Sequence, residues 1–113
     1  MIQSILVDYG GSKTEVLAFD RRRRMVRKLK IRSEPIPQLD SVILRILRRW
    51  HIKDLPLLTI GAKSVWSQAE KKWLYQRTRG LAKKVTVMSD IELAHKRIFG
   101  RKPTLIGNLS SKR

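Results

Sequence analysis

The sequence contains no cysteine and only two histidines, His51 and His95. A chain without cysteine forms no disulfide bond, no thiolate metal site and no cysteine nucleophile, and this composition fits a reducing compartment. The two histidines are too few for a histidine-based metal cluster. Thiol chemistry and histidine-rich metal centres are therefore excluded as functions of this chain.

Long apolar runs are also missing. No segment approaches the roughly 18 consecutive apolar residues that indicate a membrane-spanning helix. The N-terminal stretch Ile5-Leu6-Val7 is interrupted at once by Asp8, which is not the pattern of a secretory signal peptide. Apolar residues still make up 42% of the 113 residues, enough for a packed core. We expect a soluble cytoplasmic protein with no membrane partner, in which residues 1–113 form one domain.

Acidic residues are scarce, because 9 Asp and Glu face 26 Lys and Arg and leave a formal net charge of +17. Such an excess favours polyanions, including nucleic acid and phosphorylated ligands. Two interpretations stay open. The basic residues are either a solvated surface of the kind found in heat-adapted proteins or a surface for non-specific binding of nucleic acid, with the densest run at Arg21–Arg24.

Five short apolar stretches have the length and composition of strands. They cover residues 2–7, 15–19, 25–32, 57–60 and 85–88. Gly10 and Gly11 separate the first two stretches, and Asp20 with the arginine run separates the second from the third, so tight turns should join all three. Pro35 and Pro37 end the third strand.

Three further segments carry the signals of helices. Between Leu39 and Trp50 the apolar residues recur at i, i+3 and i+4, which predicts an amphipathic helix. Two S-x-x-E capping boxes predict helices that begin at Ser67 and Ser89. Each of these two helices should end near a glycine, at residues 80 and 100.

The order strand, strand, strand, helix, strand, helix, strand, helix predicts the fold class. Tight turns favour an antiparallel meander of the first three strands, and the strand–helix alternation after it favours parallel crossovers. We therefore predict an α/β, ribonuclease H-like half-domain with a mixed five-stranded sheet and helices on both faces. Ligands of such sheets bind beyond the carboxyl ends of the strands, where Asp8, Gly61 and Asp90 should converge.

A compact polar loop follows the first strand and reads Asp8-Tyr9-Gly10-Gly11-Ser12-Lys13-Thr14. Its glycines let backbone N–H groups approach phosphate oxygens, its hydroxyls can donate further hydrogen bonds, and its lysine supplies positive charge. A carboxylate beside phosphate is repulsive unless a cation lies between them, so Asp8 implies Mg²⁺. The loop predicts a Mg-phosphate half-site, and an ordinary β-turn with a solvated lysine is the alternative.

Asp90 lies in the first turn after the fifth strand and has two interpretations. It is either a helix cap, stabilised by the helix N-terminus, or a general base that accepts a proton from a substrate hydroxyl. Three tryptophans could stack on bases. Trp50 falls on the apolar stripe of its helix and is expected in the core, and of the three only Trp66, just ahead of a helix, stays open as a stacking candidate.

The same residues resemble a known family. Ile5-Leu6-Val7-Asp8-Tyr9-Gly10-Gly11-Ser12-Lys13-Thr14 is similar to the first phosphate motif, D-G-G-G-T-K-T, of the BadF/BadG/BcrA/BcrD ATPases, which include N-acetylglucosamine kinases. Val85–Ala94 is similar to that family's strand followed by an Asn/Ser-Asp pair that opens a helix. The resemblance implies the actin-like ATPase fold, in which two lobes close on Mg-ATP, and makes this chain the N-terminal lobe.

The resemblance also implies roles for individual residues. Asp8 would be the carboxylate linked to Mg²⁺, and Asp90 would contact a sugar substrate and act as base toward the phosphorylated hydroxyl. ATP and Mg²⁺ would be the cofactors. The residues that would hold phosphate are Gly10, Gly11, Ser12, Lys13, Thr14 and, in a second loop, Gly107.

The sequence departs from the family pattern at several positions. Tyr9 and Ser12 stand where the first motif has Gly and Thr. The second phosphate loop, G-T-G-S in the family, reads Gly107-Asn108-Leu109-Ser110, with leucine in place of the second glycine. The chain stops at Arg113, before a second lobe. We expect a truncated protein, whose cleft would need the missing second lobe or a second copy in a homodimer.

A different class of function stays open. The Asp8-Tyr9-Gly10 end of the first strand also resembles YqgF-like Holliday junction resolvases, which are single-domain nucleases with a ribonuclease H-like fold. The net charge of +17 would suit a DNA substrate. Two-metal nuclease chemistry needs several clustered carboxylates, and this chain offers Asp8 and Asp90. A non-catalytic basic module that binds nucleic acid is the third alternative.

Overall fold

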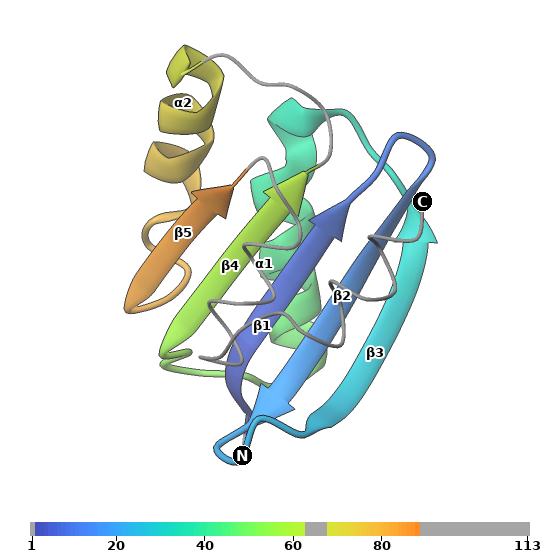
Figure 1. The fold of residues 1–113 in the computed structure, drawn as a ribbon, viewed down its shortest axis with the longest axis vertical. Helices are drawn as coiled ribbons and strands as arrows, with labels where there is room; N and C mark the ends of the chain where they lie inside the picture. The colour runs from blue at the N-terminus through green and yellow to red at the C-terminus, as the bar shows by residue number, and fades with distance from the viewer. Residues whose placement is uncertain (1, 63–67, 89–113) are drawn as a thin grey trace, which may run out of the picture.

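The computed structural model describes residues 2–62 and 68–88. These residues form a five-stranded sheet with the strand order β3-β2-β1-β4-β5 (Figure 1). The strands are β1 (Ile2–Tyr9), β2 (Lys13–Asp20), β3 (Met25–Arg32), β4 (Leu57–Ala62) and β5 (Lys84–Met88). The helices are the 3-10 helix η1 (Ile36–Gln38), α1 (Leu39–Arg49) and α2 (Gln68–Thr78).

The strand pairing confirms the predicted mixed sheet. β1 pairs antiparallel with β2, and β2 pairs antiparallel with β3. β4 lies parallel to β1, and β5 lies parallel to β4. The carboxyl ends of β1, β4 and β5 therefore meet at one edge of the sheet, where Asp8 is aligned with Gly61 and Gly61 with Met88.

Both α-helices pack against the same face of the sheet. In Figure 1 the sheet lies in front of α1. α1 follows the predicted apolar periodicity and buries Leu39, Val42, Ile43, Ile46 and Leu47. These side chains form one core cluster with Ile5 and Val7 of β1 and with Leu74 of α2. Neither α-helix of the described part is long and apolar enough to span a membrane. The third predicted helix, from Ser89, lies outside the described residues.

The opposite face of the sheet carries a second, smaller apolar cluster. Leu6 and Phe19 are buried there, and the partly buried Leu17 and Met88 pack against them. Successive side chains of a strand point to opposite faces. Asp8 therefore shares the face of Leu6. Val7 and Tyr9 of β1 face the helices, together with their β2 partners Val16 and Thr14.

Candidate phosphate-binding site

The loop after β1 is tighter than the sequence pattern predicts. β1 continues through Asp8 to Tyr9, and β2 already begins at Lys13, because the antiparallel ladder extends to the pair Tyr9–Thr14. The Gly10 backbone N–H closes the turn by donating to the Lys13 carbonyl oxygen at 3.0 Å. Asp8 and Thr14 thus have strand geometry, and only the residues between Tyr9 and Lys13 leave the sheet.

The two glycines of the turn have different surroundings. A Cβ atom on Gly10 would lie 2.7 Å from the Lys13 carbonyl oxygen, a distance that side chains essentially never reach. A Cβ atom on Gly11 would meet nothing within 4 Å. Gly10 is therefore required by the turn itself, whereas the fold places no such steric demand on Gly11.

The tip of the turn presents backbone donors to solvent. Gly11 and Ser12 are both exposed. Within residues 2–62 and 68–88, neither of their backbone N–H groups has a hydrogen-bond acceptor. The exposed side chain of Lys13 follows directly. Adjacent N–H donors next to a lysine form the arrangement that binds phosphate oxygens in many loops.

Asp8 has a carboxylate neighbour that the sequence pattern did not reveal. The strand register places Glu15 of β2 directly beside Asp8, on the same face of the sheet. Adjacent like charges repel, but the amino groups of Lys28 and Lys30 lie 3.3 and 3.9 Å from the Glu15 carboxylate and offset its charge. The period of a strand shows which face Glu15 occupies, but only the pairing register identifies its neighbour.

Asp8 fits the kind of donor set that Mg²⁺ takes beside phosphate. This ion is usually bound by one or two carboxylates, with waters and phosphate oxygens completing its shell. In the described part of the chain, no group of three or more His, Cys, Asp or Glu residues could hold a metal ion. The nuclease alternative, which needs clustered carboxylates, therefore finds only the pair Asp8 and Glu15 there.

Thr14 takes part in a hydrogen-bond network beneath the turn. Its side chain is buried, and its Oγ1 lies 2.8 Å from Oγ of Ser33, the residue after β3. Ser33 Oγ donates to the Gly10 carbonyl oxygen at 2.6 Å. A serine hydroxyl has a single proton, so Thr14 must be the donor to Ser33. The Thr14 proton is thus used within the fold, and its role as a phosphate ligand stays a prediction.

Two more contacts join the turn to the segment after β3. The Ser33 backbone N–H donates to the Ser12 carbonyl oxygen at 2.9 Å, and the Tyr9 hydroxyl donates to the Glu34 carbonyl oxygen at 2.8 Å. Ser33 therefore contacts the turn through both its backbone and its side chain. No motif in the sequence marks Ser33, and its partners lie about twenty residues earlier in the chain.

Replacing Ser33 with alanine should loosen the turn. The substitution removes the donor to Gly10 and leaves the buried Thr14 hydroxyl without its acceptor, which costs about 1–3 kcal/mol of unfolding free energy. Ser33→Thr keeps the hydroxyl and is the matched control. Urea denaturation measures the loss, and faster hydrogen exchange at the Gly10 and Ser33 amides would locate it. Equal stability of Ser33→Ala and wild type would show that the network does not hold the turn.

Other predicted site residues lie outside the described part of the chain. These residues are Asp90, Gly107 and Trp66. Trp50 lies just after α1, is partly buried and packs against the core cluster, as the apolar stripe predicted. Trp73 of α2 is 40% exposed, and the Arg77 guanidinium lies over its ring at 5.1 Å.

The arrangement of the strands and helices defines the class of protein: the chain has the actin-like ATPase fold. One similar structure is a protein with this fold and unknown function from Bacteroides thetaiotaomicron, with a TM-score of 0.56 and 9% identity. That match covers 75% of this chain and 32% of the other chain. The predicted actin-like ATPase fold and mixed five-stranded sheet are thereby confirmed. Both described α-helices lie on one face, so helices on both faces stay a prediction.

Two particular neighbours are ROK family structures with bound sugars. A ROK family glucokinase from Streptomyces griseus, in complex with glucose and AMPPNP, matches with a TM-score of 0.61 and 17% identity over 89% of this chain and 38% of its own. A ROK family protein from Streptococcus pneumoniae, in complex with sucrose, matches with a TM-score of 0.55 and 11% identity over 89% of this chain and 39% of its own.

The chain thus spans about a third to two fifths of the length of these neighbours. At these identities the similarity establishes the fold. The sequence matches no protein-family model and no curated protein.

Proposed function

We propose that this chain is the phosphate-binding N-terminal lobe of an ATP-dependent kinase or ATPase with the actin-like fold. The observation that carries the proposal is the exposed turn at the end of β1. Its Gly11 and Ser12 backbone N–H groups have no acceptor in the described residues and lie between Asp8 and Lys13. Donors that are already fixed in place bind phosphate oxygens without a cost for ordering them.

Asp8, through a bound Mg²⁺, and Lys13 would each offset part of the negative charge of a bound nucleotide. Mg²⁺ held through Asp8 would neutralise phosphate oxygens on the side of the carboxylate. The exposed ammonium group of Lys13 would attract the phosphates from solvent. The chain itself would hold the turn in place through the hydrogen bonds from Ser33 and the hydrogen bond from the Gly10 N–H to the Lys13 carbonyl oxygen.

The finer assignment is a sugar kinase of the BadF/BadG type, similar to N-acetylglucosamine kinases. It rests on the resemblance of the motif at Asp8–Thr14 and of the segment at Val85–Ala94. In this proposal Asp90 is the base toward a sugar hydroxyl, and Gly107 belongs to the second phosphate loop. Residues 1–113 form one lobe, and a second lobe completes the cleft. Glucose and AMPPNP in the glucokinase neighbour are consistent with a sugar and a nucleotide as ligands of this fold.

A nucleotide titration followed by NMR tests the proposal. Adding AMPPNP with Mg²⁺ to the folded chain should shift the amide signals of Gly11 and Ser12, and chelating Mg²⁺ should weaken binding. Asp8→Asn should reduce the Mg²⁺-dependent gain in affinity at least about tenfold, because the ion loses its carboxylate. Asp54→Asn makes the same change of charge at an exposed position between α1 and β4, and it should bind like wild type.

Two outcomes would contradict the proposal. The first is a folded chain whose Gly11 and Ser12 signals do not respond to millimolar nucleotide. The second is an equal loss of affinity in Asp8→Asn and Asp54→Asn, which would mean that only the net charge matters.

A further inference from the structure

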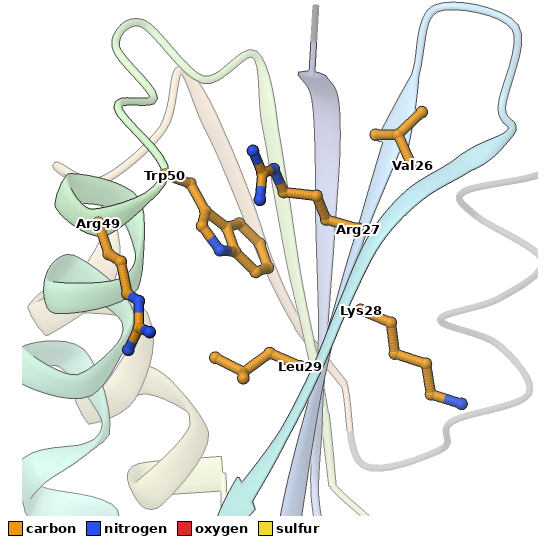
Figure 2. Close-up of a pocket in the computed structure, with 6 residues that line it drawn as sticks. All are labelled: Val26, Arg27, Lys28, Leu29, Arg49 and Trp50. Carbon is orange, nitrogen blue, oxygen red and sulfur yellow. The ribbon is translucent and has the colours of Figure 1, made fainter.

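A basic groove lies between the end of α1 and the start of β3. It has a volume of about 430 Å³ and is lined by Val26, Arg27, Lys28, Leu29, Arg49 and Trp50. Figure 2 shows Arg27 and Leu29 reaching from β3 toward the indole of Trp50, whereas Lys28 points to the other side of the strand. We call this feature the Arg27–Trp50 groove.

The two arginines of the groove have no carboxylate partner in the described part of the chain. Lys28 differs, because its amino group lies 3.3 Å from Glu15. The Arg27 guanidinium instead lies over the Trp50 ring, 5.6 Å from the ring centroid. A guanidinium held over an aromatic ring in this way still has N–H groups available for phosphate oxygens.

The densest basic run of the sequence has a different local environment. In the β2–β3 turn, the Asp20 carboxylate accepts hydrogen bonds from the Arg22 and Arg24 backbone N–H groups and from the Arg24 guanidinium. The Arg24 backbone N–H is the main cause that lowers the pKa of the Asp20 carboxyl below its usual value. Part of this run is therefore neutralised by its own acid, unlike the arginines of the groove.

We propose that the Arg27–Trp50 groove binds single-stranded nucleic acid. Arg27 and Arg49 contact the phosphates, and a base packs against the flat surface made by the Trp50 ring and the guanidinium over it. Val26 also lines the groove and adds apolar surface that is 49% exposed. Cations beside aromatic and apolar surface are what single strands need, because their bases are unpaired and their backbone is charged.

The groove is separate from the phosphate-binding turn. Met25 pairs with Phe19 at one end of the β2–β3 ladder, whereas Arg32 pairs with Lys13 at the other end, next to the turn. In Figure 1 the two ends of this hairpin lie at opposite ends of the strands, one at the bottom and one at the top of the view. The proposal therefore stands independently of the proposed kinase function, and the two sites can be tested one at a time.

Fluorescence anisotropy with labelled ten-nucleotide strands tests the groove. Arg27→Gln and Arg49→Gln should each weaken binding about tenfold, which corresponds to the loss of one charge-assisted contact. Each should also reduce the slope of log affinity against log salt by about 0.7. Arg48→Gln is the matched control, because Arg48 lies in the same last turn of α1 but does not line the groove. Parallel oligo(dT) and oligo(U) arms distinguish DNA from RNA.

Four comparisons decide the outcome. The proposal requires weaker binding of a duplex and of an abasic strand than of the base-containing strand, and unchanged binding in Gly11→Ala. Equal losses of affinity in Arg49→Gln and Arg48→Gln would show that binding depends only on net charge, and would overturn the proposal. Equal affinity for the abasic strand would also overturn the proposal, because no base would then pack against Trp50. Thermal melting of every variant confirms that the chain remains folded.

Discussion

Gly11→Ala should weaken nucleotide binding markedly and leave the fold intact. A methyl group at position 11 meets no atom within 4 Å, so the unfolding free energy should change by less than about 0.5 kcal/mol. The same methyl group would project from the tip of the turn, where a phosphate must approach the Gly11 and Ser12 N–H groups. Loss of one charge-assisted contact corresponds to a fall in affinity of roughly tenfold. Calorimetric titration with Mg-AMPPNP and urea denaturation measure the two quantities.

Gly10→Ala is the contrasting variant at the adjacent position. Its Cβ would lie 2.7 Å from the Lys13 carbonyl oxygen, a backbone atom that cannot move away without opening the turn. We expect a loss of about 1–3 kcal/mol in the unfolding free energy, as for other overpacked sites. If Gly11→Ala bound nucleotide as tightly as wild type, the turn would not be the phosphate site, whatever the result for Gly10→Ala.

Leu74→Ala should strongly destabilise the packing of α2. Leu74 has no exposed surface and is the only apolar side chain of α2 that is buried in the core cluster. Truncating a buried leucine costs about 2–5 kcal/mol. The other contacts of α2 are weaker, because the ion pair of Arg77 with Asp40 is partly exposed and such pairs contribute little. We therefore expect α2 to detach before the strands unfold.

Hydrogen exchange measured by mass spectrometry can separate local from global unfolding in this variant. The amides of α2 should lose protection by several orders of magnitude, and those of β1 by far less. Tyr75→Ala is the matched control, because the Tyr75 side chain is 42% exposed one residue away. Equal destabilisation by the two substitutions would show that helix propensity, and not the single buried contact, holds α2.

The elements of the described fold were predictable because their signals are local. The apolar stripe of α1, with Val42, Ile43 and Ile46 on one side, follows from spacing within a few residues. Gly10 and Gly11 marked the first turn for the same reason. The predicted loop was too long, since Lys13 and Thr14 belong to β2. Polar residues give no sign that a ladder continues through them, because the pairing comes from another segment.

The candidate site was predictable only in part. The motif pointed to Asp8 and the glycines as candidates, because a carboxylate can bind Mg²⁺ and glycines let backbone N–H groups approach phosphate. It attributed a free hydroxyl to Thr14, whose proton is instead donated to Ser33. Ser33 has no local signal, because its partner Gly10 lies 23 residues earlier in the chain. Long-range contacts of this kind depend on strand register and on the path of the chain after β3.

The sequence by itself determined the kinds and order of the described strands and α-helices, the mixed sheet and the position of the Gly10–Ser12 turn, because periodicity and turn residues act over short distances. Only the tertiary structure decided which residues became neighbours. Register placed Glu15 beside Asp8, and packing of α1 on the sheet placed Arg27 over Trp50. Neither contact can be inferred from spacing along the chain, since each joins separate elements through the core that they share.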